Sequence, residues 1–316
     1  MKFKRILKPV FLLFVLQTIA FSGWTQARLF PEELEEIQGG AKVYYSVAEA
    51  LPESENVLRL DIRQQHYTSF TPDLSQLLNL EFLNATKNQM AEVSPEIGGS
   101  QYLKEIVFRE NSLWFLPDSF FTLANLQTLD LSQNQFSEME AGFGKLQKLE
   151  VLLLQENLLQ EIAPEIGNMK RLSVLDLSHN QLEMLPPQMA KLHNLHELTL
   201  TQNNLRELPK KLGKLKHLEH LALENNQLTA LPKQSGKMRR LCSLSLSNNQ
   251  LKTVPESLTK LRNLEVLDLG NNQLTALPQN VENLKKLQTL ILVGNNIPEE
   301  EIIRIIDALP ETTVLF

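Results

Sequence analysis

Apolar positions recur along most of this chain in a fixed order, with a polar stretch that ends in asparagine after each pair of closely spaced leucines. One unit reads Leu172, Leu175, Leu177, Asn180, Leu182, Leu185, Pro186, Met189, Leu192, and the same columns return 23 residues later. Asparagine holds its column at Asn88, Asn111, Asn134, Asn157, Asn180, Asn203, Asn226, Asn249, Asn272 and Asn295. A period of this length predicts a stack of small units that share one core.

Each unit is predicted to contain one short strand. Leu175 and Leu177 are separated by one residue, which is the period of a strand with one buried face. Strands that return every 23 residues are expected to lie side by side and parallel, about 4.8 Å apart. The Leu185-Pro186 step then turns the chain outward. We expect each asparagine amide to bond backbone groups of its own turn and of the next one.

The pattern L-x-x-L-x-L-x-x-N-x-L-x-x-L-P resembles the leucine-rich repeat family, and its spacing is similar to the 23-residue class. That class occurs in Ras-suppressor-type proteins and in exported bacterial proteins. The resemblance covers eleven repeats at residues 57–309. It implies an α/β solenoid, a curved horseshoe with a parallel sheet on the concave face. Short helical or extended segments would form the convex face.

Several units depart from the pattern. Gln65 stands where the first asparagine is expected, and Ala85 and Ser100 occupy core columns. Glu140 and Ala163 replace the usual proline, which leaves the path of the outer segment open in those two units.

Both flanks of the repeats are predicted to be caps. Ser46 to Glu49 fits a capping box that opens a short helix, within an N-terminal flank at residues 28–56. A C-terminal cap at residues 298–316 overlaps the last repeat. It begins with Pro298 and three glutamates, which suit a helix start. The expected core-covering face of this helix is Ile302, Ile303, Ile306 and Leu309, and residues 313–316 are predicted to form an edge strand.

Residues 1–27 are predicted to be a secretory signal peptide. Basic residues from Lys2 to Lys8 precede an apolar run from Pro9 to Phe21, and small residues follow. The expected cleavage is after Ala27, with Ser22 as the alternative. The sequence therefore predicts export to a periplasmic, cell-surface or extracellular location. It also predicts no transmembrane segment in the mature chain, because the apolar run is shorter than a membrane span.

Composition argues against several kinds of chemistry. The formal charge of −6 does not fit a basic nucleic-acid footprint, and Cys242 is the single cysteine. No phosphate loop and no G-x-S-x-G elbow is present. We therefore predict no enzymatic activity, no cofactor and no nucleic-acid partner.

Two histidine pairs raise the question of a metal site. His193 and His196 are followed 24 residues later by His217 and His220, one place out of step with the repeat. This offset is expected to place His196 beside Glu219, and His220 beside Glu197. Histidine–glutamate neighbours on a polar surface are ordinary, so no metal site is predicted.

A candidate binding surface lies between the strand leucines, where side chains point away from the core onto the inner sheet. At its centre, apolar side chains are framed by Asp130, Asp176 and Glu156, like the core and rim of an interface. The candidate partner-binding residues are Val107, Asp130, Val151, Leu153, Val174, Asp176 and His220. The alternative is that these aliphatics only favour strand formation. A second, more basic candidate comprises Arg59, Arg63, Phe82, Lys87 and Arg109.

The sequence thus predicts an exported, non-enzymatic repeat protein that binds a protein partner through its concave face. One alternative is a glycan-binding or surface-adhesion role, against which the scarcity of inward aromatic residues counts. Another is a repeat-bearing effector enzyme, which would need a catalytic domain beside the repeats. Asn84-Ala85-Thr86 matches a glycosylation acceptor, but is expected on the inner sheet.

Overall fold

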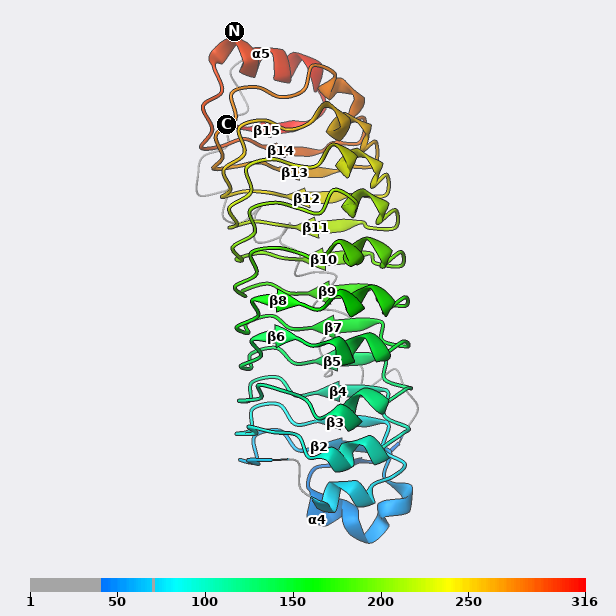
Figure 1. Ribbon diagram of the computed structural model, residues 1–316. Helices are drawn as coiled ribbons and strands as arrows, with labels where there is room; N and C mark the ends of the chain where they lie inside the picture. The colour runs from blue at the N-terminus through cyan, green and yellow to red at the C-terminus, as the bar shows by residue number, and fades with distance from the viewer. Residues whose placement is uncertain (1–40, 70–71) are drawn as a thin grey trace. The chain divides into compact units, whose positions relative to one another are not determined.

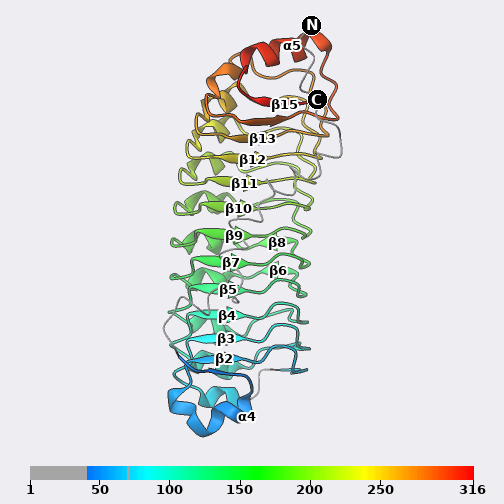
Figure 2. The ribbon, with the colours of Figure 1, turned by 180° about the vertical axis from the view of Figure 1, so that it is seen from behind.

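Each repeat contributes one three-residue strand to a single parallel sheet (Figures 1 and 2). The computed structural model describes residues 41–69 and 72–316, and residues 43–316 form one compact unit. In that unit the main sheet has 13 strands, which follow one another in chain order and pair at equivalent repeat positions. The strands are β1 (Val43–Tyr44), β2 (Arg59–Asp61), β3 (Phe82–Asn84), β4 (Glu105–Val107), β5 (Thr128–Asp130), β7 (Val151–Leu153), β9 (Val174–Asp176), β10 (Glu197–Thr199), β11 (His220–Ala222), β12 (Ser243–Ser245), β13 (Val266–Asp268), β14 (Thr289–Ile291) and β15 (Thr313–Leu315). The parallel strand predicted for each repeat is confirmed.

Short 3₁₀ helices form the outer part of the repeats and lie in a column beside the strands (Figure 1). They are η1 (Leu51–Asn56), η2 (Pro72–Gln76), η3 (Pro95–Gly99), η4 (Asp118–Thr122), η5 (Ala141–Lys145), η6 (Pro164–Asn168), η7 (Pro187–Lys191), η8 (Leu212–Lys214), η9 (Lys233–Lys237), η10 (Glu256–Lys260) and η11 (Val281–Asn283). The chain enters η4, η7, η8, η9 and η11 through a Leu-Pro step, whose proline lacks the N–H that a longer strand would use.

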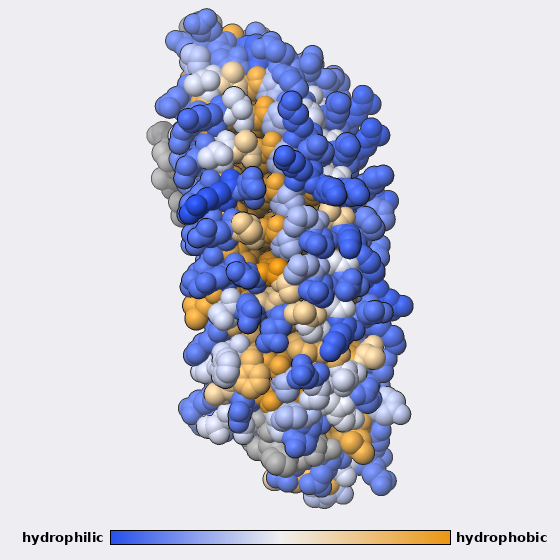
Figure 3. All heavy atoms as spheres, viewed as in Figure 1, coloured by the Kyte–Doolittle hydropathy of each residue, from blue (hydrophilic) through white to orange (hydrophobic). Residues whose placement is uncertain are grey.

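One continuous hydrophobic cluster runs through the stack from Tyr44 to Leu309. In the main sheet from β2 to β14, the second residue of each strand, such as Leu152, Leu175 or Leu198, is fully buried. Figure 3 shows apolar residues also gathering in a band along the surface, bordered by hydrophilic residues. The aliphatic core predicted from leucine periodicity is therefore shared by all repeats, as a solenoid requires.

The asparagine column forms a ladder of buried amides. In Asn180, Nδ2 donates to the carbonyl oxygens of Leu177 (3.1 Å) in its own turn and Leu154 (2.9 Å) in the preceding repeat. Its Oδ1 accepts from the Leu159 amide of that preceding repeat at 2.9 Å. The expected link to the next repeat was wrong in direction. The side chain bonds to the preceding repeat because the turn directs it toward that repeat.

A second feature of this turn went unpredicted. The residue before each ladder asparagine has a positive φ, from 50° at Asn271 to 74° at Gly294. Its amide bonds forward, as His179 N does to the Thr201 oxygen (2.8 Å). Each turn is therefore tied to both neighbouring repeats, backward by a side chain and forward by the backbone.

The two repeats without the usual proline gain an extra pair of strands. β6 (Glu138–Met139) and β8 (Glu161–Ile162) pair in parallel, outside the main sheet. The Ala163 amide donates to the Met139 oxygen at 2.9 Å, a bond that proline at this position cannot make. Pro186 stands at the equivalent place in the next repeat. The outer segments of these two repeats therefore form paired strands, because Ala163 supplies an N–H donor that proline lacks.

At the front of the stack, α4 (Val47–Ala50) begins as predicted. The Ser46 side chain accepts from the Glu49 amide at 3.2 Å, while the Glu49 carboxylate accepts from Tyr45 N. The sequence did not predict β1, which extends the main sheet by one strand ahead of the first repeat. The predicted signal peptide and residues 28–40 of the predicted N-terminal flank lie outside the described residues.

At the back, α5 (Glu299–Ala308) follows Pro298, and β15 forms the predicted edge strand. The predicted core-covering face was partly wrong. Ile303 and Ile306 are 54% and 47% exposed, whereas Ile305 and Leu309 are buried. The helix is rotated about its axis by its anchorage, in which Glu301 accepts from Leu277 N (2.9 Å) and Arg304 donates to the Leu277 oxygen (3.1 Å).

We expect Asn180→Ala to lower the unfolding free energy by about 1–3 kcal/mol or more, because it leaves buried backbone groups of two repeats without partners. Urea denaturation followed by circular dichroism measures this. Gln181→Ala, at the next and exposed position, is the control and should change stability by less than about 0.5 kcal/mol. Equal effects of the two substitutions would contradict a structural ladder.

Ser100 offers a test in the opposite direction. It lies in a core column, and its fully buried Oγ has no hydrogen-bond partner. We expect Ser100→Ala to raise the unfolding free energy by about 1 kcal/mol, since an unsatisfied hydroxyl is removed. Thermal unfolding beside Ser137→Ala, an exposed serine, checks it. A lower midpoint for Ser100→Ala would show that the hydroxyl has a stabilising partner.

Candidate partner-binding surface

The first and third residues of each strand in the main sheet point away from the core, and we call this surface the sheet face. Cross-strand register brings the predicted residues into two adjacent rows. Third positions place Val107, Asp130, Leu153 and Asp176 on consecutive strands. First positions place Val151, Val174, Glu197 and His220 on consecutive strands. The predicted set is therefore contiguous except at β10, where Glu197 separates Val174 from His220.

The two rows differ in how much surface they offer. The third-position side chains of Val107, Asp130 and Leu153 are only 6%, 9% and 5% exposed. The first-position side chains Val151, Val174, Glu197 and His220 are half-buried. Asp176 is an exception in its row, because it is half-buried as well. A partner would therefore touch mainly the first-position row and Asp176, a distinction that alternation along the strand does not predict.

Asp130 and Asp176 both have a local structural task. Asp130 Oδ1 accepts from the Ser132 amide (2.9 Å) and hydroxyl, and Asp176 Oδ1 accepts from the same groups of Ser178 (2.9 and 2.6 Å). Such bonds stabilise the turn that follows the strand. Burial raises the pKa of both carboxyls, and the serine bonds act in the opposite direction. The Asp-Leu-Ser triplet was the sequence signal for this role.

Glu197 was missing from the predicted set, although its carboxyl on the sheet face is strongly perturbed. Burial, with the Asp176 carboxylate as a second cause, raises the pKa of Glu197 to about 7. Burial likewise raises the pKa of Glu105 on β4 and of Glu224 beyond β11. Perturbed acids of this kind are candidates for a functional site because the charged form gains from a cationic partner.

The basic residues at the front of the sheet face already have partners within the chain. The Arg59 guanidinium lies 4.5 Å from the centre of the Phe82 ring. Lys87 pairs with Glu110 (3.4 Å), and Arg109 Nε lies 3.6 Å from the same Glu110 carboxylate. These contacts leave this second candidate surface with fewer available charges than its sequence suggests.

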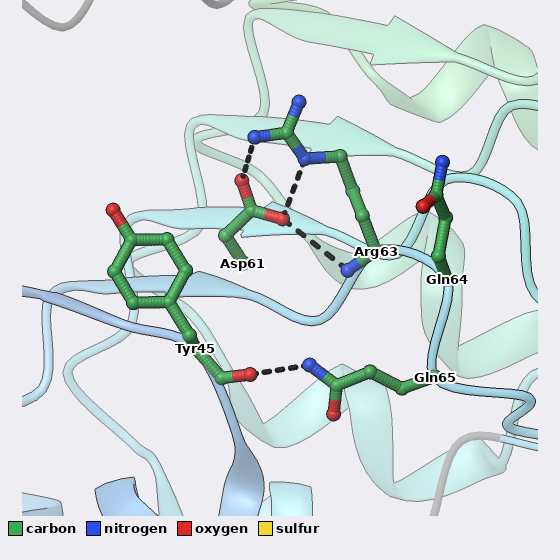
Figure 4. A pocket seen from close by; sticks show the side chains of 5 residues that line it. All are labelled: Tyr45, Asp61, Arg63, Gln64 and Gln65. Atoms are coloured by element: carbon green, nitrogen blue, oxygen red, sulfur yellow. Dashed lines mark hydrogen bonds and ion pairs between the residues drawn. The ribbon is translucent and has the colours of Figure 1, made fainter.

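A shallow pocket of about 320 Å³ lies at the same end, lined by Tyr45, Asp61, Arg63, Gln64 and Gln65 (Figure 4). Arg63 binds both oxygens of Asp61, through Nε and Nη2 at 2.9 Å each. The Gln65 amide donates to the Tyr45 carbonyl oxygen. The pocket wall is thus built from residues already engaged with one another.

Both predicted histidine–glutamate neighbours are found. His220 lies opposite Glu197, and the Glu219 amide donates to the His196 carbonyl oxygen (2.8 Å). The His196 ring also lies 6.0 Å from the His217 ring. Across residues 41–69 and 72–316, no group of three or more histidine, cysteine or acidic side chains is placed to hold a metal ion.

Two other sequence candidates are also placed. Burial, and then Glu265 and Glu219, raise the pKa of the Cys242 thiol, which disfavours a reactive thiolate. Asn84, in the glycosylation motif, is 1% exposed, and its Oδ1 accepts from Thr86.

Comparison with known families agrees with this architecture. A family profile described as "Leucine-rich repeat region" matches residues 53–181 and 188–269, and further leucine-rich repeat profiles match 262–303 and 171–192. The chain belongs to the leucine-rich repeat family. No curated protein matches it. Within the described residues, no helix combines the length and the apolar character needed to cross a bilayer.

Solved structures similar to this repeat protein include plant receptors and a bacterial internalin. "Plant peptide hormone receptor RGFR1 in complex with RGF2" is 27% identical, with TM-score 0.68, over 76% of this chain and 40% of that one. The ectodomain of GASSHO1/SCHENGEN3 from Arabidopsis thaliana, in complex with CASPARIAN STRIP INTEGRITY FACTOR 2, is 27% identical, with TM-score 0.67, over 81% and 31%. An internalin from Listeria monocytogenes is 22% identical, with TM-score 0.76, over 87% and 78%. The repeat protein therefore spans less than half of either plant receptor chain.

Glu197 gives a pH test of the sheet face. Its folded pKa of about 7 exceeds the usual 4.5, so its charged form destabilises the native state above pH 7 and this effect fades as pH falls toward 4.5. We expect Glu197→Gln to raise the melting temperature by a few °C at pH 8 and to change it little at pH 5. Scanning calorimetry at both values measures this. Glu219→Gln is the control, and an equal gain at both pH values would refute the shift.

Proposed function

We propose that this leucine-rich repeat protein is exported, has no enzymatic activity, and binds a protein partner through the sheet face, the concave side of the predicted horseshoe. The observation that carries the proposal is the contiguous patch on β5, β7, β9 and β10. There, the half-buried Val151 and Val174 lie beside Asp130, Asp176 and Glu197. An apolar centre with a charged margin is the usual layout of a protein interface.

A rigid surface suits such binding. The patch is carried by in-register strands whose turns are fixed by the asparagine ladder, so little ordering is needed when a partner associates. The two plant receptors described above are named as complexes with RGF2 and with CASPARIAN STRIP INTEGRITY FACTOR 2. They support a peptide or protein ligand here, as an analogy from the same repeat family.

Export is supported by the order of basic, apolar and small residues in positions 1–27. The glycan-binding alternative is less favoured. Phe82 is the one aromatic residue at an outward position of strands β2 to β15, it is 6% exposed, and Arg59 lies over its ring. A sugar would find no free aromatic ring on these strands to stack against.

We expect Val174→Arg to weaken partner binding at least tenfold, because it places a charged, bulky group at the centre of the patch. The partner is first isolated by affinity capture from the native organism, and binding of the purified pair is then measured by surface plasmon resonance. Thr229→Arg is the matched control, since Thr229 is exposed on an outer segment. Binding that survives Val174→Arg while the variant remains folded would remove the sheet face from the proposed function.

A further inference from the structure

Charge is unevenly distributed over the sheet face. From β5 to β14, no first or third strand position carries lysine or arginine, although the chain contains 31 such residues. The same positions hold Asp130, Asp176, Glu197 and Asp268. The lysines and arginines of these repeats therefore lie on other segments, and the four Asp and Glu residues carry the charge on this part of the sheet face.

The front of the sheet face is different. There, Asp61 pairs with Arg63, two residues further along the chain (2.9 Å), and Glu81 pairs with Lys104 just before β3 and β4 (2.8 Å). Within the described residues, no ion pair reaches Asp130, Asp176 or Glu197. The Arg109 and His179 charges lower the pKa of Asp130 and Asp176 from beyond ion-pair distance, and no cation is among the causes that shift the pKa of Glu197.

These acids, together with Glu105 on β4, flank an apolar centre, and the Arg59 charge lowers the pKa of Glu105 against the effect of burial. On one side, Glu105 and Asp130 lie diagonally on β4 and β5. On the other, Asp176 and Glu197 lie diagonally on β9 and β10. Between them, β7 and β9 present Val151, Leu153 and Val174. With strands about 4.8 Å apart, Asp130 and Asp176 are separated by about 10 Å, and Glu105 and Glu197 by about 19 Å.

We propose that this surface binds an extended segment of the partner that carries one basic side chain on each side of a short apolar stretch. The inference rests on the proposed function and specifies its partner. An extended chain advances about 3.3 Å per residue, so the two acidic pairs suit basic residues about three to six positions apart. The alkyl stems of lysine or arginine would cover Val151 and Val174, while their charged ends reach the carboxylates.

Binding of such a segment is coupled to protonation. The groups that face Glu197 are Asp176 on β9 and His220 on β11, with His179, His196 and Glu219 beside these strands. Burial raises the pKa of Glu197 to about 7 and lowers that of His220, so His220 is neutral near pH 7. A cation held against Glu197 stabilises its carboxylate, which means that complex formation releases a proton. Affinity therefore rises as pH increases through 7.

The probe is an end-capped synthetic peptide in which one lysine stands on each side of an alanine–valine spacer of about four residues. A peptide of the same composition with adjacent lysines is the spacing control. Isothermal titration calorimetry at fixed ionic strength should show tighter binding of the spaced peptide. Its affinity should be about tenfold higher at pH 8 than at pH 6, because the ionised fraction of Glu197 rises from about one tenth to nine tenths.

Glu197→Gln should remove most of this pH dependence, and Glu219→Gln should retain it. Equal binding of the two lysine peptides, an unchanged pH response in Glu197→Gln, or no peptide binding would overturn the inference. Equal binding of a glutamate version of the spaced peptide, or of a polyanion such as RNA, would also overturn it. If Val174→Arg abolishes capture of the natural partner while the lysine peptides fail, the proposed function stands and only this partner chemistry is excluded.

Discussion

The structure depends on the inability of one repeat to satisfy its own turn. A three-residue strand followed by a left-handed residue leaves backbone N–H and C=O groups pointing into the stack, where water cannot reach them. The asparagine amide meets both needs at once, donating to carbonyls such as Leu154 O and accepting from amides such as Leu159 N. Because these partners belong to the preceding repeat, each unit is completed only by its neighbour. This explains why the period never slips between Asn88 and Asn295.

The stacked strands and the asparagine ladder are predictable from the sequence, because both follow from the regular spacing and the side-chain chemistry of the leucine and asparagine columns. The positive φ before each asparagine was less visible, since Lys87, Glu110 and Gln133 give no sign of it. Asn225, Asn248, Asn271 and Gly294 do, because such residues tolerate the left-handed region. A partial second ladder was also missed, in which Asn79, Asn125, Asn194 and Asn263 donate to carbonyls 24 residues earlier. Its column is filled only intermittently.

The position of the candidate surface was predictable from the sequence, but the exposure of its individual side chains was not. Alternation along a strand says that Val151 and Leu153 both point outward, yet only the first is appreciably exposed. The third position leads into the turn, and Leu153 lies there between Asp130 and Asp176 of the two neighbouring strands. Asp130 and Asp176 each use one carboxylate oxygen to accept hydrogen bonds from the serine two residues later. The second carboxylate oxygen of each is not bonded in this way. Glu197, which has no such bond, is the acid most able to respond to a partner.

In-register stacking also limits how charge can be arranged. A like-charged residue at the same position of the next strand would lie about 5 Å away and destabilise the sheet. No two carboxylates occupy such neighbouring outward positions from β2 to β15, since Leu153 separates Asp130 from Asp176, and Val174 and His220 flank Glu197. In the small second sheet, Glu138 does face Glu161, but both are exposed and solvated. The main sheet thus carries its acids as diagonal pairs around Val151 and Val174. That spacing limits their mutual repulsion and leaves each pair able to receive an external cation.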